Sequence, residues 1–267
     1  MGLNPFNNYE CDLATRIPQF DRQFDLVVHA AGDIRPEKSM SVNYEGTRNL
    51  CVALETAPPQ QLVYISSVQV YGKTQGENYD ETIKPAPITD YGKSKFEAEK
   101  FLKEWCVTHN VTLSILRPPM IIGTGMKGTL RAMVNGIYRG YYRHIKGCDA
   151  RRSIIHAVDV ASAVKRIAPV GGTFNITDRD NPTVHNLAEA LAYRMGNKRI
   201  YVVSLKKARM LAWFGDKFSF MPFSSQQLSQ LTETLTFNSD AISRVIDWQP
   251  HGVTNYLRTH NYDENSL

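Results

Sequence analysis

Tyr91 and Lys95 are the two residues whose types and spacing could perform acid/base chemistry. They lie four residues apart in a segment that predicts a helix, so their side chains occupy one face, one turn apart. A tyrosine is a poor acid or base at neutral pH because its ordinary pKa is about 10. A neighbouring ammonium favours the phenolate and lowers that pKa. The pair could therefore move a proton where a hydroxyl becomes a carbonyl.

Ser67 is the third candidate, because it follows the apolar run Gln61–Ile65. Loops after parallel strands form the binding crevice of an open sheet, and a hydroxyl there could hydrogen-bond the reacting oxygen. Tyr-x-x-x-Lys taken alone has an ordinary alternative. It is also the pattern of an amphipathic helix start with a lysine whose stem covers apolar surface.

Apolar runs alternate with helical patterns in the first half of the chain. Three runs are typical of buried parallel strands, namely Asp25–Gly32, Gln61–Ile65 and Val111–Leu116. Two segments have helical spacing, Asn43–Leu54 and Tyr91–Thr108, and Thr89 or Asp90 could cap the second. This alternation predicts an α/β fold with a parallel sheet, helices on both faces and right-handed crossovers.

The second half is less regular. We predict strands at 152–155, 173–176 and 199–203, helices at 157–167 and 184–195, and a helical pattern from 205 onward with a loop near 218–224. The predicted domain boundaries are 1–117, which holds the catalytic candidates, and 118–267, which is a smaller α+β substrate-binding region interleaved with the sheet.

Composition restricts the class of protein. Hydrophobic residues make up 42% and charged residues 21%, which predicts a globular chain. The net charge of +5 is mild and no long Lys/Arg run occurs, so we expect a small anionic ligand and no nucleic acid. Neither a secretory signal nor an apolar stretch of about 18 residues is found, so we expect no membrane span and a cytoplasmic protein.

The cysteines indicate no metal site. Cys11, Cys51, Cys106 and Cys148 form no Cys-x-x-Cys pair and have no histidine cluster at metal-ligand spacing. We expect free thiols in a reducing compartment.

Several motifs occur in a fixed order around the chemical pair. The sequence reads His-Ala-Ala-Gly at 29–32, Val-Asn-Tyr-Glu-Gly-Thr at 42–47, Tyr-Ile-Ser-Ser-Val-Gln-Val-Tyr-Gly at 64–72, Tyr-Gly-Lys-Ser-Lys at 91–95 and Leu-Arg-Pro-Pro at 116–119. With them the chain resembles the extended short-chain dehydrogenase/reductase superfamily, or NAD-dependent epimerase/dehydratase family, from about Cys11 to about Pro250. The resemblance implies a Rossmann-like doubly wound parallel sheet and NAD or NADP as cofactor.

The resemblance also implies roles for individual residues. Tyr91 resembles the catalytic acid/base, Lys95 the residue that binds the nicotinamide ribose and tunes the tyrosine, and Ser67 the group that polarises the substrate oxygen, with Ser66 as the second choice. The other implied cofactor-binding residues are Asp12 and Leu13 at the adenine, Ala30, Ala31 and Gly32 along the adenosine and pyrophosphate, and Pro118 and Met120 at the nicotinamide amide. Tight strand–helix packing is the alternative reading of the three small residues.

Further positions carry weaker implications. Arg152 resembles the arginine that meets the substrate's phosphates, although a solvated surface pair with Arg151 is an equal alternative. His156 and Asp159 are expected to serve structure, Trp248 to lie in the core, and Asn43 to support the active site.

One motif of the family is not found. The family begins with a strand, a Gly-x-x-Gly-x-x-Gly turn and a helix that hold the pyrophosphate, and the first residues that match here are those after its third strand. The resemblance therefore implies an N-terminally truncated sheet with an unpaired edge at the strand of residues 26–30. A fragment, a second chain that fills the gap, and a degenerate member with weak cofactor affinity are the three explanations. Preference between NAD and NADP cannot be read.

The reaction class is narrowed by two positions. The dehydratases of the family carry Asp-Glu after the catalytic hydroxyl residue, but Val68 and Gln69 stand here, so dehydration is disfavoured. We expect an epimerase or reductase that moves hydride at a sugar or alcohol carbon, with a nucleotide-sugar as substrate. A reductase of a non-nucleotide ketone is one alternative, because Ala208–Phe223 could line an apolar pocket or form an ordinary helical core. A non-catalytic regulatory protein is the other, and a homodimer is implied by resemblance alone.

Overall fold

The structure is a computed structural model that describes residues 10–126, 128–217 and 223–259. It divides the chain into two compact units. Unit 1 contains residues 1–72, 81–117 and 163–174, and unit 2 contains residues 73–80, 118–162 and 175–267. The chain crosses from unit 1 to unit 2 between residues 117 and 118. Two segments are exceptions to this division of the sequence: residues 73–80 belong to unit 2, and residues 163–174 belong to unit 1.

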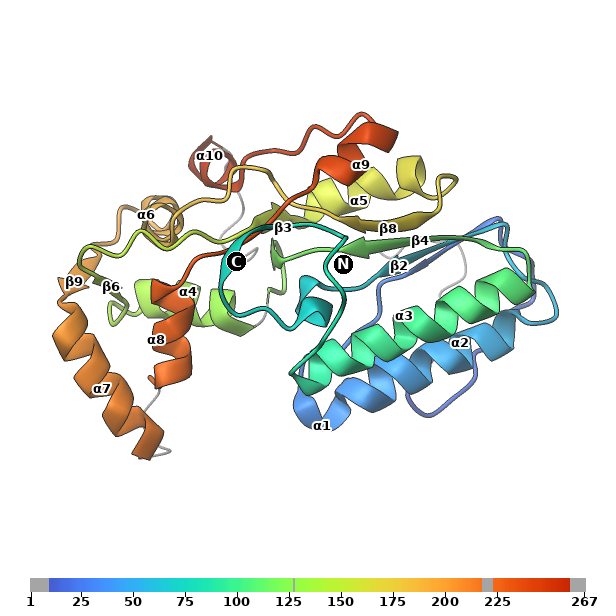
Figure 1. Ribbon diagram of the computed structural model, residues 1–267, viewed down its shortest axis with the longest axis horizontal. Coiled ribbons are helices and arrows are strands. Elements are labelled where there is room, and N and C mark those ends of the chain that lie inside the picture. The colour runs from blue at the N-terminus through green and yellow to red at the C-terminus, as the bar shows by residue number, and fades with distance from the viewer. Residues whose placement is uncertain (1–9, 127, 218–222, 260–267) are drawn as a thin grey trace. The chain divides into compact units, whose positions relative to one another are not determined.

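Unit 1 is built on a sheet of four strands. Its strands are β1 (Leu26–His29), β2 (Gln61–Ile65), β4 (Thr112–Arg117) and β8 (Gly172–Asn175), in that order. β1 is parallel to β2, with Val28 opposite Val63, and β2 is parallel to β4, with Tyr64 opposite Ile115 (Figure 1). The predicted α/β fold with a parallel sheet is confirmed.

The helices of unit 1 follow the predicted segments closely. α1 (Pro36–Ser39), the π-helical segment η1 (Met40–Glu45) and α2 (Gly46–Leu54) succeed one another without a break. The longest helix is α3 (Asp90–Thr108), and the Thr89 hydroxyl caps it by accepting a hydrogen bond from the Gly92 amide at 3.0 Å. A short 3-10 turn, η2 (Val68–Tyr71), follows β2.

The core of unit 1 lies between the sheet and helices α2 and α3, which run side by side (Figure 1). It contains Leu50 and Leu54 from α2, Leu62 and Tyr64 from β2, and Leu102 from α3. Apolar residues at helical spacing thus meet a strand whose side chains are largely buried, which is why the two patterns could be read from the sequence.

β1 is the edge strand of this sheet. Within the described residues it pairs only with β2, and Val28 in its middle is 44% exposed. The strand was expected to be buried like its neighbours, but only its last residue, His29, is.

The described residues of unit 2 form three two-stranded parallel sheets. The pairs are β3 (Gly76–Tyr79) with β10 (Leu235–Phe237), β5 (Met120–Ile122) with β7 (Ile154–His156), and β6 (Arg143–Ile145) with β9 (Tyr201–Val203). Its helices are α4 (Gly128–Tyr138), α5 (Ala157–Ile167, whose last turn belongs to unit 1), α6 (Val184–Arg194), α7 (Leu205–Lys217), α8 (Ser225–Thr232), α9 (Asp240–Val245) and α10 (Val253–Thr259). Its largest apolar cluster joins α4, α6 and α10.

The stretch Ala208–Phe223 agrees with the predicted helical core only in part. Of its described residues, Ala208 and Ala212 are buried, whereas the large apolar side chains Met210, Leu211 and Trp213 are exposed. Residues 218–222 lie outside the described residues. Ala208 and Ala212, with Phe223 packed beside them, therefore belong to a core cluster, whereas Met210, Leu211 and Trp213 lie outside it.

Two further expectations concern the chain as a whole. The four cysteines are free thiols, and those at positions 51 and 106 are buried. Among the helices of the described residues, none combines the length and the apolar character that crossing a bilayer requires.

Candidate active site at the ends of the unit 1 strands

Ser67 and Tyr91 are brought together in unit 1. Ser67 caps η2, directly after β2, and its hydroxyl accepts a hydrogen bond from the Gln69 amide at 3.2 Å. Tyr91 lies in the first turn of α3, and interaction with the Ser67 side chain lowers the pKa of its phenol against the larger, raising effect of burial. The predicted acid/base and the predicted hydroxyl partner therefore lie near each other.

Lys95 lies one turn further along α3 and is only 3% exposed. Its Nζ donates to the Ile65 carbonyl at 2.9 Å and, more weakly, to the Ala31 carbonyl at 3.5 Å, and it sits 4.8 Å from the centroid of the Tyr64 ring. Burial lowers the pKa of Lys95 to about 8, against the opposing effect of Glu99. An ammonium has three donors, so at least one N–H remains for another group.

The expected effect of Lys95 on Tyr91 is not found. Burial raises the pKa of Tyr91 above its ordinary value, and the hydrogen bond from Ser67 is what opposes this rise. The interpretation that the ammonium lowers the pKa of Tyr91 is therefore wrong for this structure. The physical reason is the burial of the phenol, which is the largest effect on its pKa, while the Lys95 Nζ donates to the Ala31 and Ile65 carbonyls.

The titration of Lys95 gives a testable pH dependence. The folded pKa is about 8 and the ordinary value is 10.5, so between these values the unfolded chain binds more protons. Stability must therefore rise with pH across this range, by an amount on the order of 3 kcal/mol for a shift of this size. Urea unfolding of the Lys95→Met variant should lack this rise, whereas Lys93→Met, at an exposed position of the same helix, should keep it. Parallel curves for wild type and Lys95→Met would contradict the burial of a charged Lys95.

Asn43 ties three segments around the site. Its Oδ1 accepts from the Asp33 amide at 2.8 Å, and its Nδ2 donates to the Asp33 carbonyl and to the Ser94 hydroxyl, both at 2.9 Å. It is fully buried. A supporting role was expected for Asn43, and these contacts fix the loop after β1 to η1 and α3.

The small residues after β1 fall into two groups. Ala30 and Ala31 are exposed at the end of the strand. A Cβ atom on Gly32 would lie 3.2 Å from both Asn43 Oδ1 and Lys95 Nζ, so this glycine packs tightly and a larger residue would push these side chains aside. Close approach of a ligand therefore stays a prediction for Ala30 and Ala31, whereas tight packing describes Gly32.

Ser66 is engaged elsewhere. It is buried and donates its hydroxyl to Glu99 Oε1 at 2.5 Å. Its predicted contact with the cofactor is therefore a weaker hypothesis than its observed role, which is to anchor the end of β2 to α3.

Glu99 is the residue that sequence reasoning missed. It is completely buried and forms an ion pair with Arg117, whose Nε and Nη2 donate to its two oxygens at 2.9 and 2.5 Å. Arg117 also donates to the Tyr71 hydroxyl at 2.9 Å. The signal was present, since Glu99 follows Lys95 by four residues and Lys95 follows Tyr91 by four, which places all three on one helix face.

Asp12 and Leu13 form a turn against α2. The Asp12 carbonyl accepts from the amides of Thr15 and Arg16 at 3.0 and 2.9 Å, and the Leu13 carbonyl accepts from Asn49 Nδ2 at 2.8 Å. The turn belongs to unit 1. Its proposed position beside an adenine stays a prediction.

Pro118, Met120 and Arg152 belong to unit 2. Pro118 is buried, and Met120 packs against the largest apolar cluster of that unit. The Arg152 guanidinium donates through Nε and Nη2 to the Gln230 carbonyl at 3.1 and 2.7 Å, and burial lowers its pKa. Arg152 is thus half-buried on a backbone carbonyl, so the surface-pair alternative does not describe it.

The residues expected to serve structure do so. His156 Nδ1 accepts from the Val158 amide at 3.1 Å, and Asp159 Oδ1 lies 2.7 Å from His251 Nδ1. Trp248 is buried and donates from Nε1 to the Thr177 carbonyl at 3.2 Å.

A Gly-x-Gly-x-x-Gly spacing at Gly123, Gly125 and Gly128 was overlooked in the sequence. It lies between β5 and α4 in unit 2, and all three glycines have positive φ. A Cβ atom at Gly125 would meet nothing within 4 Å. The turn conformation alone therefore accounts for glycine there.

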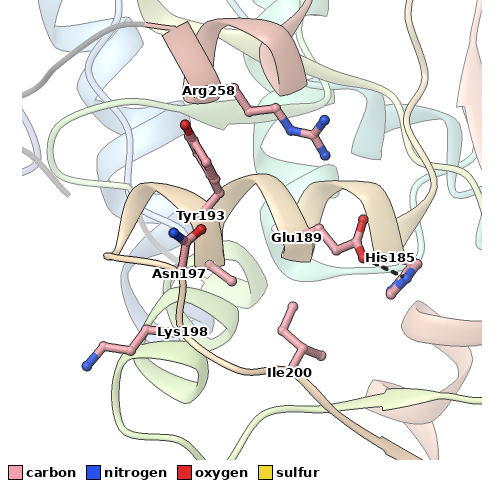
Figure 2. A pocket seen from close by; sticks show the side chains of 8 residues that line it. His185, Glu189, Tyr193, Asn197, Lys198, Ile200 and Arg258 are labelled. Carbon is pink, nitrogen blue, oxygen red and sulfur yellow. Dashed lines mark ion pairs between the residues drawn. The ribbon is translucent and has the colours of Figure 1, made fainter.

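Unit 2 also contains an open pocket of about 410 Å³ beside α6 and α10. Figure 2 shows His185 and Glu189 at one end of it, where His185 Nε2 and Glu189 Oε1 form an ion pair of 3.2 Å, and Arg258 above the helix. None of the predicted site residues lines this pocket. The candidate active site is accordingly the Ser67–Tyr91–Lys95 group of unit 1.

The residues of this group fit part of a dinucleotide cofactor. Exposed Ala30 and Ala31 leave the end of β1 open, and the buried Lys95 ammonium beside them keeps an N–H for a ribose hydroxyl. In the described part of the chain, no glycine turn that could hold a pyrophosphate follows a strand of the unit 1 sheet.

The fold is that of the Rossmann-type α/β proteins. Residues 5–177 match the NAD dependent epimerase/dehydratase family, and the chain belongs to this family. A solved structure of RMD from Pseudomonas aeruginosa, complexed with NADPH, superposes with a TM-score of 0.69 at 22% identity, and the match covers 96% of this chain and 85% of that one.

Two curated relatives are epimerases. The N-acetyl-alpha-D-glucosaminyl-diphospho-ditrans,octacis-undecaprenol 4-epimerase of Escherichia coli O157:H7 is 27% identical over 186 residues, covering 66% of this chain and 56% of the relative. The UDP-glucose 4-epimerase of Vibrio cholerae is 23% identical over 216 residues, covering 78% of this chain and 64% of the relative. The chain thus spans less than two thirds of the length of either relative.

Proposed function

We propose that the protein is an NAD(P)-dependent epimerase or reductase that acts on a sugar joined to a diphosphate, with a nucleotide-sugar as the first candidate substrate. The observation that carries the proposal is that Tyr91 interacts with the Ser67 side chain and lies one helical turn from the buried ammonium of Lys95. Family membership and two sugar-diphosphate epimerases among the relatives support it.

The residues divide the work between them. A bound nicotinamide would accept or supply the hydride. The raised pKa of Tyr91 keeps its phenol protonated at neutral pH, so the group is set to donate a proton to a carbonyl oxygen. Ser67 fixes the direction of the phenol and could donate to the same oxygen. Lys95 would hold the ribose of the cofactor through its remaining N–H.

Sugar dehydration is disfavoured by the two residues after Ser67. Val68 is buried and apolar, and the Gln69 side chain accepts a hydrogen bond from Thr89 at 3.1 Å. Neither can act as the carboxyl group that removes water, so we exclude this reaction from the proposal.

A second candidate substrate is a sugar linked by its diphosphate to a polyprenol. Its specific support is the exposed apolar side chains of α7, together with the polyprenol-linked substrate in the name of the Escherichia coli relative. The reductase of a non-nucleotide ketone and the non-catalytic regulatory protein remain the alternatives from other classes.

Binding measurements test the proposal in two stages. Fluorescence titration with NADH and with NADPH should show saturable binding that Lys95→Met weakens. The cofactor that binds with the higher affinity is then the preferred one. Calorimetry with UDP-glucose, and assays with a polyprenyl-diphosphate sugar, then decide the substrate class. Turnover with a steroid or flavonoid ketone alone would favour the ketone reductase. Substrate and cofactor binding without turnover would favour the regulator.

A further inference from the structure

In helix α7 the largest apolar side chains face outward, whereas the buried residues that face the interior of the protein are small. Its buried positions, Ala208 and Ala212, pack against Ile145 and Leu228, together with the partly buried Leu205 at the start of the helix. Its outward positions carry large apolar side chains, which are Met210 at 56%, Leu211 at 42%, Trp213 at 51% and Phe214 at 38% exposure. A surface helix normally shows the opposite arrangement.

The outward residues form one surface. Met210, Trp213 and Phe214 are related by spacings of three and four residues, which places them on one side of the helix, opposite the two alanines. The Trp213 and Phe214 rings contact each other at 4.9 Å. A contiguous exposed apolar patch of this kind marks an interaction site more often than scattered residues do. We call these four residues, Met210, Leu211, Trp213 and Phe214, the α7 patch.

Positive charge surrounds the α7 patch. Lys206, Lys207, Arg209 and Lys217 are exposed on the same helix, and the Lys217 ammonium lies 3.9 Å from the centroid of the Trp213 ring. The single acidic side chain of α7, Asp216, accepts hydrogen bonds from Ser225. A second copy of this face would bring like charges together, whereas an anionic surface would be complementary to it.

From this combination we propose that α7 is a membrane-surface helix that docks the protein on a bilayer containing anionic phospholipids. Trp, Phe, Leu and Met would enter the boundary between headgroups and acyl chains, and the lysines would meet the lipid phosphates. The helix has 13 residues and would lie in the plane of the surface over roughly 20 Å. The inference holds whichever sugar diphosphate the active site accepts.

The sequence directly after α7 is also rich in large apolar residues. Residues 218–222 read Phe-Ser-Phe-Met-Pro and contain no charge. They lie outside the described residues, and the proposal rests on α7 alone.

Trp213 is a built-in reporter for the test. The chain has three tryptophans, and the other two, Trp105 and Trp248, are 8% and 4% exposed. Adding vesicles of equimolar phosphatidylcholine and phosphatidylglycerol to the full chain should shift the tryptophan emission to shorter wavelength. Brominated acyl chains should quench it. Vesicles of phosphatidylcholine alone should give a much smaller effect, because the attraction to anionic lipid is lost.

Variants separate the two parts of the surface in a vesicle sedimentation assay. Trp213→Ser with Phe214→Ser should weaken binding at least about tenfold, through loss of apolar insertion. Lys206→Gln with Lys207→Gln should weaken it roughly twenty-five-fold on anionic vesicles, at about fivefold for each charge. Tyr193→Ser removes an equally exposed aromatic residue from α6 and should bind like wild type.

Two results would overturn the proposal. One is unchanged emission with the protein left in the supernatant. The other is a concentration-dependent dimer, seen by analytical ultracentrifugation, that the Trp213→Ser and Phe214→Ser changes abolish while vesicles do not compete. Neither readout uses enzymatic activity, so the outcome does not depend on the proposed function.

Discussion

The Tyr91→Phe variant is expected to lose turnover by about a hundredfold to ten-thousandfold, which is the usual contribution of a positioned acid/base. The substitution removes only the phenol hydroxyl, whose pKa the Ser67 side chain lowers. The ring stays, so helix α3 and the buried contacts of Lys95 should be preserved. Steady-state kinetics with the sugar diphosphate that the wild type converts should show the loss in kcat, with KM and cofactor affinity little changed.

Tyr44→Phe is the matched control for this variant. Tyr44 also lies in unit 1, but its ring packs edge-on against Phe101 and beneath Arg48. Removal of its hydroxyl should leave kcat within about twofold, as expected for a group that contributes no proton transfer. Turnover by Tyr91→Phe equal to that of wild type would show that the proton comes from another group, and the proposed mechanism would then be wrong.

The sequence was most informative where one physical pattern dominated. The buried run at 61–65 and the long helix at 91–108 are correct to within one residue, and Thr89 is the cap. These segments combine strong periodicity with a clear capping residue. The segment at 43–54 was harder, because helical structure begins earlier, at Pro36, and includes a π-helical part that periodicity does not reveal.

The sequence predicted which residues form the candidate site, but it did not predict the hydrogen bonds that they make. Spacing along α3 brings Tyr91 and Lys95 onto one face, but it does not say which carbonyls will hold the Lys95 ammonium. That choice depends on how β1 and β2 end relative to α3, which is a tertiary property. The same reason explains the wrong pKa direction for Tyr91, since burial of the phenol was not visible in the sequence.

The exposed face of α7 shows a different limit. The composition of Ala208–Phe223 indicated a helix with an apolar face, and a helix is found. Composition cannot say which face turns inward, and here the alanines do. Sequence periodicity identifies an amphipathic surface without identifying its partner.

Glu99→Ala is expected to destabilise unit 1 by about 3–5 kcal/mol, because it leaves the Arg117 guanidinium buried without its partner. Both side chains are almost completely inaccessible, at 0% exposure for Glu99 and 3% for Arg117. The Ser66 hydroxyl would also lose its acceptor. Urea unfolding should report the loss as a lower midpoint with an unchanged slope.

Glu97→Ala provides the comparison on the same helix. Glu97 forms a surface ion pair with Lys100, with side-chain exposures of 39% and 49%, and such pairs contribute about 0–1 kcal/mol. A loss at Glu99 no larger than that at Glu97 would show that Arg117 finds another partner.

A second measurement tests how Glu99 affects the candidate active site. The charge of Glu99 opposes the lowering of the Lys95 pKa, so Glu99→Gln, which keeps the side-chain shape, should lower that pKa further below about 8. An NMR titration of the Lys95 Nζ and Cε signals would detect this change. Because the Glu99 carboxylate joins Arg117 of β4 to Ser66 at the end of β2 from within α3, loss of its charge should affect the strand ends and the lysine together.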